Sequence, residues 1–254
     1  MPLHRRLTLP FVTTALLLCQ PLLAFDTPLS PEAVRDAYFL GQHNDENTAA
    51  AFVPYFRVLP APESGPHIAE VEVYTPYLQV LEASRRRSMG YSAQQAEQDY
   101  RHHHDKLYVR VRIDFTDSYG NLELYRSAKS DAQQSGEAPL PDFYRDFRVG
   151  FSQRSGPSRE GQWIEPLRII LQTTDTYNSG HYAFVPEDLG LNAYLSGSGP
   201  AYAYGSRNGG YYPTGWLVWL EFDAQDVASD DASVEVITTD GQHVSVPFDL
   251  SALR

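Results

Sequence analysis

The stretch "KLYVRVRIDF", Lys106–Phe115, is the clearest strand in the chain. From Leu107 onward, an apolar side chain stands at every second position and polar or amphipathic side chains stand between them. Successive side chains of a β-strand point to opposite faces of a sheet, so this pattern predicts a strand with one buried face. The turn residues Tyr119-Gly120-Asn121 follow, and we expect a partner strand over Leu122–Arg126.

Six further segments carry the alternation or the short apolar runs that are typical of strands. Asp240-Gly241 separates the last two and indicates a tight hairpin turn. Phe52, Tyr55 and Val58 are also apolar, but Pro54 cannot donate a ladder hydrogen bond, so we expect an edge strand there. The six segments are "HIAEVEVYTP" (67–76), "DFYRDFRVGFSQ" (142–153), "WIEPLRIILQTT" (163–174), "WLVWLEFDAQ" (216–225), "SVEVITTD" (233–240) and "HVSVPFDL" (243–250).

Starts of short helices are confined to the N-terminal half. Ser30-Pro31 supplies an N-cap and a residue suited to the first helical position. Thr75-Pro76 has the same character and precedes apolar residues at helical spacing. Ser92 and Gln95 have capping-box spacing, which predicts a third helix that runs toward the histidines at 102–104.

The composition agrees with strands joined by many turns, because the chain has 17 tyrosines, 12 phenylalanines, 17 glycines and 18 prolines. We therefore predict a mainly β fold: an antiparallel β-sandwich-like body with two or three short helices in the N-terminal half. Residues 25–254 are expected to form a single β-rich domain, with a polar linker or surface loop near residues 127–141.

The first 24 residues have the layout of a secretory signal peptide. A basic head at 4–6 precedes the apolar run Leu7–Leu18, and Ala24 stands just before the sequence becomes polar. We expect cleavage after Ala24 and a periplasmic or extracellular protein. An uncleaved membrane anchor is the alternative, but the run is shorter than the roughly 20 residues that span a bilayer. The mature chain is expected to have no integral membrane span.

Removal of the leader would leave 18 basic and 32 acidic residues, a formal charge of −14, and would take away Cys19, the only cysteine. Nucleic acids and anionic membrane surfaces repel such a chain, so neither is expected as a partner. An exported protein without cysteine has no disulfide bonds, so its stability depends on its apolar core.

The sequence "DYRHHHDK", Asp99–Lys106, places three histidines between two aspartates. On a strand, His102 and His104 would point to the same side, about 6.5–7 Å apart, and could bind zinc with His181 or a carboxylate as third ligand. On a helix, no pair has the i, i+4 spacing of metal-binding helices. The capped helix before the triplet and the strand after it favour a structural role, with a zinc site as the alternative.

Residues 178–215 are rich in glycine, tyrosine, serine and proline. Tyrosine offers contact area at low entropic cost, so this composition suits a ligand-binding surface, for example one that stacks on sugar rings. The alternative is that the rings pack over the sheet as a folded flap. The candidate ligand-binding residues are Tyr202, Tyr204, Tyr211, Tyr212 and Trp216.

Carboxylates crowd the C-terminal part, as in "DAQDVASDDAS" (223–233). They could hold calcium, but their spacing differs from that of an EF-hand loop, so a solvated acidic turn is favoured. The sequence has no G-x-S-x-G nucleophile motif, no phosphate-binding loop and no dinucleotide fingerprint. We expect no resident cofactor and name no catalytic residue, with zinc and calcium as the alternatives.

The leader, "LSPEAVRDAYFLGQ" (29–42) and "HVSVPFDLSALR" (243–254) resemble exported bacterial proteins with no assigned activity. The resemblance implies export and carries no site residues. We therefore expect a non-enzymatic exported protein that binds or supports a cell-envelope partner, either a protein or a glycan. The alternatives are a metal-dependent or carboxylate-based hydrolase, and a carbohydrate-binding module that uses the tyrosine-rich segment.

Overall fold

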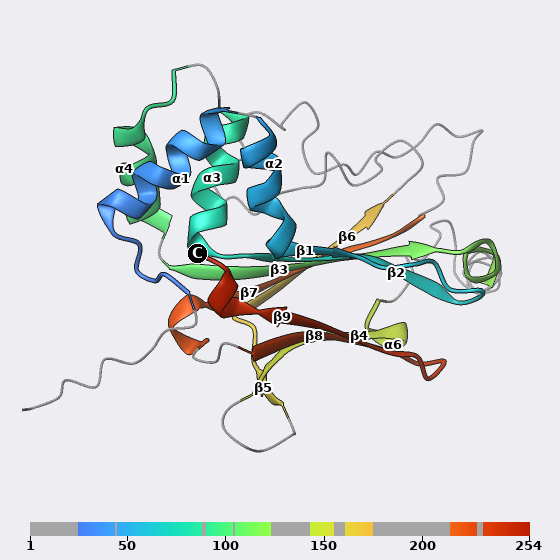
Figure 1. Cartoon of the computed structure of the whole chain (residues 1–254). Coiled ribbons are helices and arrows are strands. Elements are labelled where there is room, and N and C mark those ends of the chain that lie inside the picture. The colour runs from blue at the N-terminus through green and yellow to red at the C-terminus, as the bar shows by residue number, and fades with distance from the viewer. Residues whose placement is uncertain are drawn as a thin grey trace, which may run out of the picture.

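Two antiparallel sheets packed face to face, with a cluster of helices on one of them, form the protein (Figure 1). The structure is a computed structural model and describes residues 25–43, 45–87, 90–103, 105–122, 143–154, 161–174, 214–227 and 231–254. The sandwich-like, mainly β fold with helices in the N-terminal half confirms the prediction from the sequence. None of the helices in the described residues is both long and apolar enough to cross a membrane.

The larger sheet has five strands in the order β1-β2-β3-β7-β6, and every neighbouring pair is antiparallel. The strand predicted over 106–115 is β3, at the centre of this sheet, where Val111 pairs with Val71 on one side and Val218 on the other. The strands are β1 (Phe56–Val58), β2 (Pro66–Tyr74), β3 (Lys106–Phe115), β7 (Gly215–Asp223) and β6 (Arg168–Thr174).

The smaller sheet has four strands in the order β5-β4-β8-β9, again all antiparallel. The predicted hairpin joins the last two, and Gly241 takes φ +92° in its turn, a conformation that glycine adopts without steric cost. The strands are β5 (Gln162–Ile164), β4 (Phe147–Gln153), β8 (Asp231–Thr238) and β9 (His243–Asp249).

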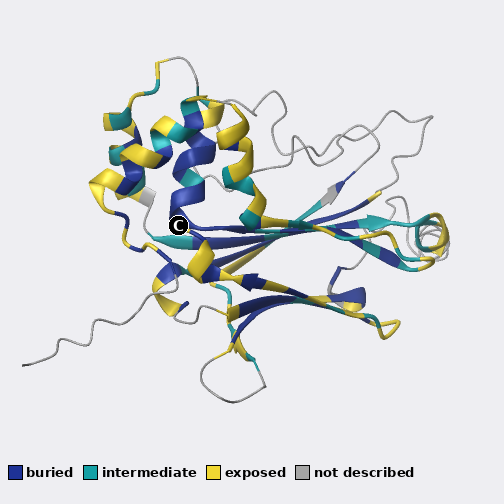
Figure 2. Ribbon diagram, viewed as in Figure 1, coloured by how far each residue is buried: buried dark blue, intermediate teal, exposed yellow. Residues whose placement is uncertain are grey.

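The main core lies between the two sheets, where dark blue ribbon marks the buried residues in Figure 2. Phe222 on β7 and Phe151 on β4 meet there, with their ring centroids 5.4 Å apart. Strand β7 is buried along nearly its whole length, which explains why its sequence is apolar at almost every position. A strand covered on both of its faces has little need for polar residues.

Helices cover the outer face of the five-stranded sheet near the end where β2 leads into α3 (Figure 1). They enclose a second apolar cluster that includes Val34, Ala37 and Leu81. The predicted caps are present: Ala33 N donates to Ser30 Oγ at 3.1 Å, and Ser92 N donates to Gln95 Oε1 at 2.8 Å. The helices are α1 (Pro31–His43), α2 (Glu46–Phe52), α3 (Pro76–Arg86) and α4 (Ala93–His103).

Short helical turns complete the described chain. They are η1 (Val53–Tyr55), α6 (Phe143–Asp146), η3 (Ala224–Asp226), η4 (Leu250–Ala252) and a helical segment at 117–122.

One local prediction is confirmed only in part and another is wrong. The predicted edge strand exists as β1, at the edge of the larger sheet. Residues 52–55 are helical and the edge strand starts only at Phe56, because Asp45 caps α2 by accepting from Thr48 N at 3.0 Å and η1 follows directly. Leu122 belongs to the helical segment 117–122, not to a strand. Tyr119 anchors that segment by donating to Asp146 at 2.9 Å. The remainder of the predicted partner strand, the leader and the linker at 127–141 lie outside the described residues.

Helix α3 carries a buried carboxylate, Glu82, whose side chain is 4% exposed. Arg85 lies 2.9 Å away and Arg86 2.5 Å away, one helical turn further along. Burial would raise the pKa of Glu82, but the hydrogen bonds and charges of the two arginines outweigh burial and hold its pKa below the usual range. Glu82 is therefore ionised in the folded protein over a wider pH range than in the unfolded chain.

We expect Glu82→Gln to lower the free energy of unfolding by about 1–3 kcal/mol at pH 7 and by much less at pH 3. A folded pKa below the unfolded one gives stability that is complete above roughly pH 4.3, the ordinary glutamate value, and is lost as the pH falls through the folded pKa. Urea unfolding of both proteins at the two pH values measures this. An equal difference at pH 7 and pH 3 would show that the charge of Glu82 is not responsible.

Candidate functional site

The first two histidines of the triplet, His102 and His103, are the last residues of α4. The His102 ring is exposed and its Nδ1 lies 2.6 Å from the carbonyl oxygen of Gln98, one turn back. The backbone of His102 is therefore helical, which is not the extended geometry that a His-x-His pair requires. His104, His181 and the His103 side chain lie outside the described residues. Within the described ranges, no group of three potential metal-ligating residues is present.

A polar cleft of about 490 Å³ adjoins the end of α4. Tyr100 ties its walls together: the hydroxyl donates to Asp105 and accepts from Leu29 N at 2.6 Å. Burial, together with the hydrogen bond to Asp105, raises the pKa of Tyr100, so its hydroxyl keeps its proton. The "DYRHHHDK" sequence thus supplies a structural tie between the helix and the segment before α1. The lining residues are Pro28, Leu29, Tyr100, Arg101, Asp105, Asp223 and Gln225.

Of the five candidate ligand-binding residues in the tyrosine-rich segment, the structure describes only Trp216. Trp216 lies in β7, is 6% exposed, and packs edge-on against Phe143 with ring centroids 5.6 Å apart. Its indole belongs to the core between the sheets and has little surface to offer a ligand. Tyr202, Tyr204, Tyr211 and Tyr212 lie outside the described residues.

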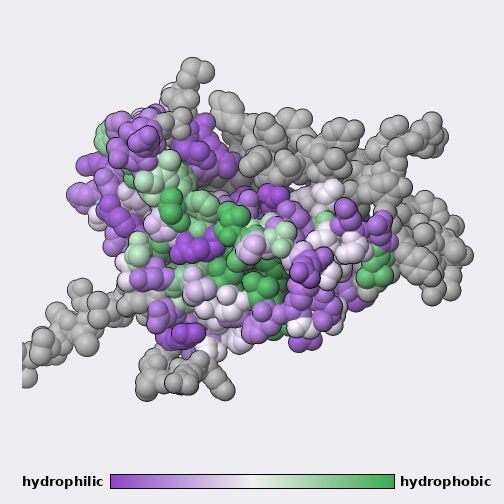
Figure 3. All heavy atoms as spheres, turned by 45° about the vertical axis from the view of Figure 1, so that its right-hand side comes forward, coloured by the Kyte–Doolittle hydropathy of each residue, from purple (hydrophilic) through white to green (hydrophobic). Residues whose placement is uncertain are grey.

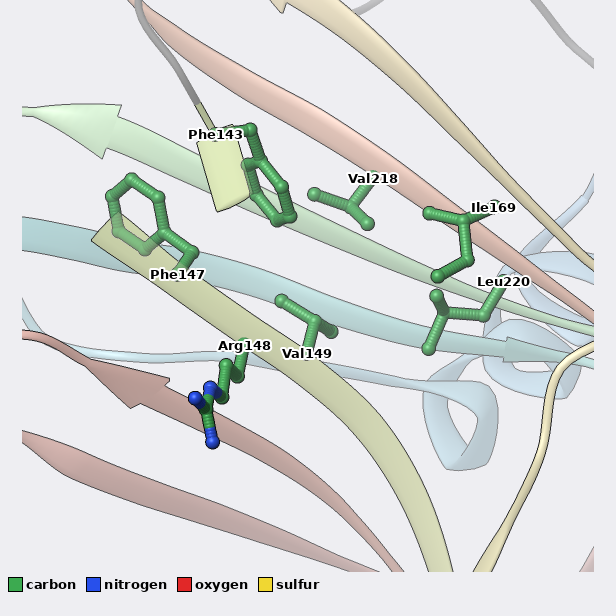
Figure 4. Close-up of a pocket in the computed structure, with 7 residues that line it drawn as sticks. All are labelled: Phe143, Phe147, Arg148, Val149, Ile169, Val218 and Leu220. Carbon is green, nitrogen blue, oxygen red and sulfur yellow. The ribbon is translucent and has the colours of Figure 1, made fainter. Parts of the chain in front are cut away.

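A second cleft, of about 230 Å³, opens between the two sheets at the β6 edge (Figure 4). Ile169, Val218 and Leu220 come from the larger sheet, and Val149 points toward them from β4. Phe143 and Phe147, which stack with centroids 5.4 Å apart, close one end. The Arg148 side chain points away from these apolar groups, so the cleft has an apolar lining with one cation at its rim.

The backbone at this cleft belongs to two strand edges. Among the described residues, β6 pairs only with β7, on one of its sides. β5 pairs with β4 only at 151–153, so residues 147–150 of β4 also have no described strand on that side. Apolar side chains are exposed beside it, with Leu167 at 62% and Ile169 at 38%. We call the cleft together with Leu167 and Ile169 the edge cleft.

The opposite edge of the sandwich is different. There Arg57 of β1 places its guanidinium 4.9 Å from the centre of the Phe248 ring on β9, which links the two sheets. Val53, Phe56 and Val58 are exposed along the same strand and the turn before it. In Figure 3, apolar side chains gather between the polar surface of the helices and that of the smaller sheet. The edge cleft combines an apolar pocket with a strand edge, so we take it as the candidate for ligand binding.

A half-buried ion network occupies the outer face of the five-stranded sheet. Arg110 of β3 contacts Glu72 and, at 3.5 Å, Glu70 of β2, and its guanidinium lies 5.8 Å from the centre of the Trp219 ring. Burial raises the pKa of the neighbouring Tyr74 hydroxyl, so this group is neutral at physiological pH. The network pairs charges across strands and offers no described opening for a substrate.

The described histidine side chains all contact other groups of the protein. His43, His67 and His102 each contact a backbone carbonyl, and His243 contacts the Glu235 carboxylate at 2.7 Å. A nucleophilic triad needs an imidazole bonded to a hydroxyl or thiol, and none of these four is arranged so.

The edge cleft could not be found from the sequence. Its lining comes from three segments, 143–149, 169 and 218–220, and their alternation indicates only that these side chains face a core. Comparisons with known proteins add no assignment: no family model matches the sequence, and neither the curated proteins nor the solved structures searched contain a match.

Proposed function

We propose that the chain is an exported, non-enzymatic protein that binds an envelope protein by pairing an extended segment of it with the β6 edge. The observation that carries the proposal is the edge cleft, where a strand edge that has no neighbour among the described residues lies together with an apolar pocket. Strand addition uses both features: main-chain hydrogen bonds give affinity, and pockets for alternate side chains give specificity.

The chemistry of the lining defines the segment. Its inward side chain would contact Ile169, Val149 and Leu220, all of them aliphatic, so a leucine, isoleucine or phenylalanine is expected at that position. Arg148 at the rim favours an acidic residue nearby. The segment is therefore expected to be extended, apolar at alternate positions, and neutral or mildly acidic.

Selection of a displayed library of random 12-residue peptides on the purified full-length chain tests this proposal. We expect enriched peptides with alternating apolar residues. Their affinity should fall tenfold or more in Ile169→Asp, because a buried aliphatic contact of about 1.5–3 kcal/mol is replaced by a charge.

The matched control is Val58→Asp, which places the same charge on an exposed β-branched residue of the other edge strand, β1. It should leave peptide affinity unchanged. No enriched peptides, or equal affinities for the parent chain and Ile169→Asp, would refute strand addition at β6.

A further inference from the structure

The outer face of the four-stranded sheet carries an exposed indole held against the sheet. Trp163 of β5 is 52% exposed. A Cβ atom built on Gly150 of β4 would lie 1.9 Å from its Cζ3 atom, so the ring occupies the space in which a side chain at 150 would stand. Glycine at this position is what allows the indole to lie across β4.

Polar groups continue from the indole across the same face. Gly150 pairs with Glu235, and Glu235 pairs with Ser245, so the three positions form one row across β4, β8 and β9. The Glu235 carboxylate accepts from Ser245 Oγ at 2.7 Å and contacts His243 Nε2 at 2.7 Å. Inward-facing neighbours such as Val234 and Val236 belong to the core, so the row faces outward. We call Trp163, Glu235, His243 and Ser245 the outer row.

From this arrangement we infer that the outer row binds a neutral polysaccharide chain. The apolar face of a sugar ring can pack on an indole, whose face is large, rigid and amphipathic. The hydroxyls at the ring edge need donors and acceptors beside that face, and the outer row supplies a carboxylate, an imidazole and a hydroxyl already fixed by hydrogen bonds. Such fixed groups lose little conformational entropy on binding.

The charge of the row argues against an anionic glycan or a phosphate. Glu235 stands at its centre, and although Arg148 faces outward in the neighbouring row with His243, the whole chain has a formal charge of −12. Like charges next to each other weaken association, so an uncharged polymer is the ligand that this face accepts. The inference does not depend on strand addition at β6, because the outer row faces away from the edge cleft between the sheets.

Binding of the full-length chain to soluble neutral glucan, xylan, mannan and galactan, followed by tryptophan fluorescence and affinity electrophoresis, tests the inference. The chain has three tryptophans, and Trp216 and Trp219 are buried, so a fluorescence change on binding reports Trp163. We expect at least one of these polysaccharides to bind. Trp163→Ala should weaken that binding tenfold or more.

Gly150→Val is the second variant, because its side chain displaces the indole without removing it. Gly150→Val should weaken polysaccharide binding as much as Trp163→Ala does, although the fluorescence of Trp163 itself is retained. Phe39→Ala, an exposed ring on α1, and Ile169→Asp are the controls and should bind as the parent does. Absence of binding by the parent chain, or equal binding by Trp163→Ala, would overturn the inference. The inference would also be overturned if the parent chain bound no polysaccharide but formed a dimer that Trp163→Ala abolished. That result would assign the face to a second copy of the chain.

Discussion

Replacement of Arg110 by methionine is expected to lower the free energy of unfolding by about 3 kcal/mol, measured by urea denaturation at pH 7. The guanidinium side chain is 16% exposed and lies between Glu72, Glu70 and the Trp219 ring. Methionine fills a similar volume but leaves Glu72 largely buried beside no cation. The cost comes from that uncompensated charge, because a carboxylate loses its water on folding and regains nothing in exchange.

The shift of the Arg110 pKa agrees with a stabilising role for the positive charge. Burial alone would lower it, but the carboxylates of Glu72 and Glu70, and the charge that Tyr74 takes on only at high pH, outweigh burial and raise the pKa of Arg110 above its usual range. The charged form is therefore the one that the fold stabilises.

Arg112→Met is the matched control, since it removes the next arginine on the same face of the same strand. Arg112 lies 2.8 Å from Asp114 and 3.3 Å from Glu70, and these groups are more exposed to water, so we expect a cost of about 1 kcal/mol or less. The double variant Arg110→Met, Glu72→Leu should recover most of the loss, because an apolar pair replaces the buried ion pair. Equal costs for Arg110→Met and Arg112→Met would contradict the explanation.

Strong local patterns accounted for much of the fold. The alternation in Lys106–Phe115 predicted β3 because period-two patterning is imposed by burial of one face, and the structure places that strand at the centre of the larger sheet. The Ser30 and Ser92 caps likewise marked true helix starts, because each satisfies backbone N–H groups that the helix itself leaves without partners.

Weak local patterns were misread where another interaction decided the structure. The apolar residues 52–55 resemble a strand, yet α2 starts at the Asp45 cap and continues into a turn before β1. After β3, Tyr119-Gly120-Asn121 resembles a hairpin turn. Its residues form a helical segment held by the ring contacts of Tyr119 with Phe115 and Phe147, and the second of these depends on a distant strand.

Both binding surfaces depend on strand order, which no local pattern encodes. The edge cleft exists because β5 covers only part of β4 and β6 has no described neighbour beyond it. Trp163 in the sequence stood within a predicted strand, and nothing there paired it with Gly150, thirteen positions earlier. The histidine triplet, by contrast, attracted attention because of its composition, and at His102 the structure gives it a helix end.

Phe222→Ala is expected to cost about 3–5 kcal/mol, because the ring is fully buried between the sheets and alanine leaves a cavity that the surrounding strands fill only in part. Its partner Phe151 comes from the other sheet, so the cavity lies where the two sheets meet. Phe39→Ala, which removes an exposed phenylalanine from α1, should change the free energy of unfolding by less than about 0.5 kcal/mol.

The same variant tests whether the two sheets unfold together. Tryptophan fluorescence follows the larger sheet through Trp216 and Trp219 and the smaller sheet through Trp163, while far-ultraviolet circular dichroism follows both. If the shared core joins them into one cooperative unit, Phe222→Ala shifts the midpoint of both signals equally. Separate midpoints would show that the sheets are stable independently and that the Phe151–Phe222 contact contributes little to either. A single shifted transition is expected, because the main apolar cluster contains side chains from both sheets.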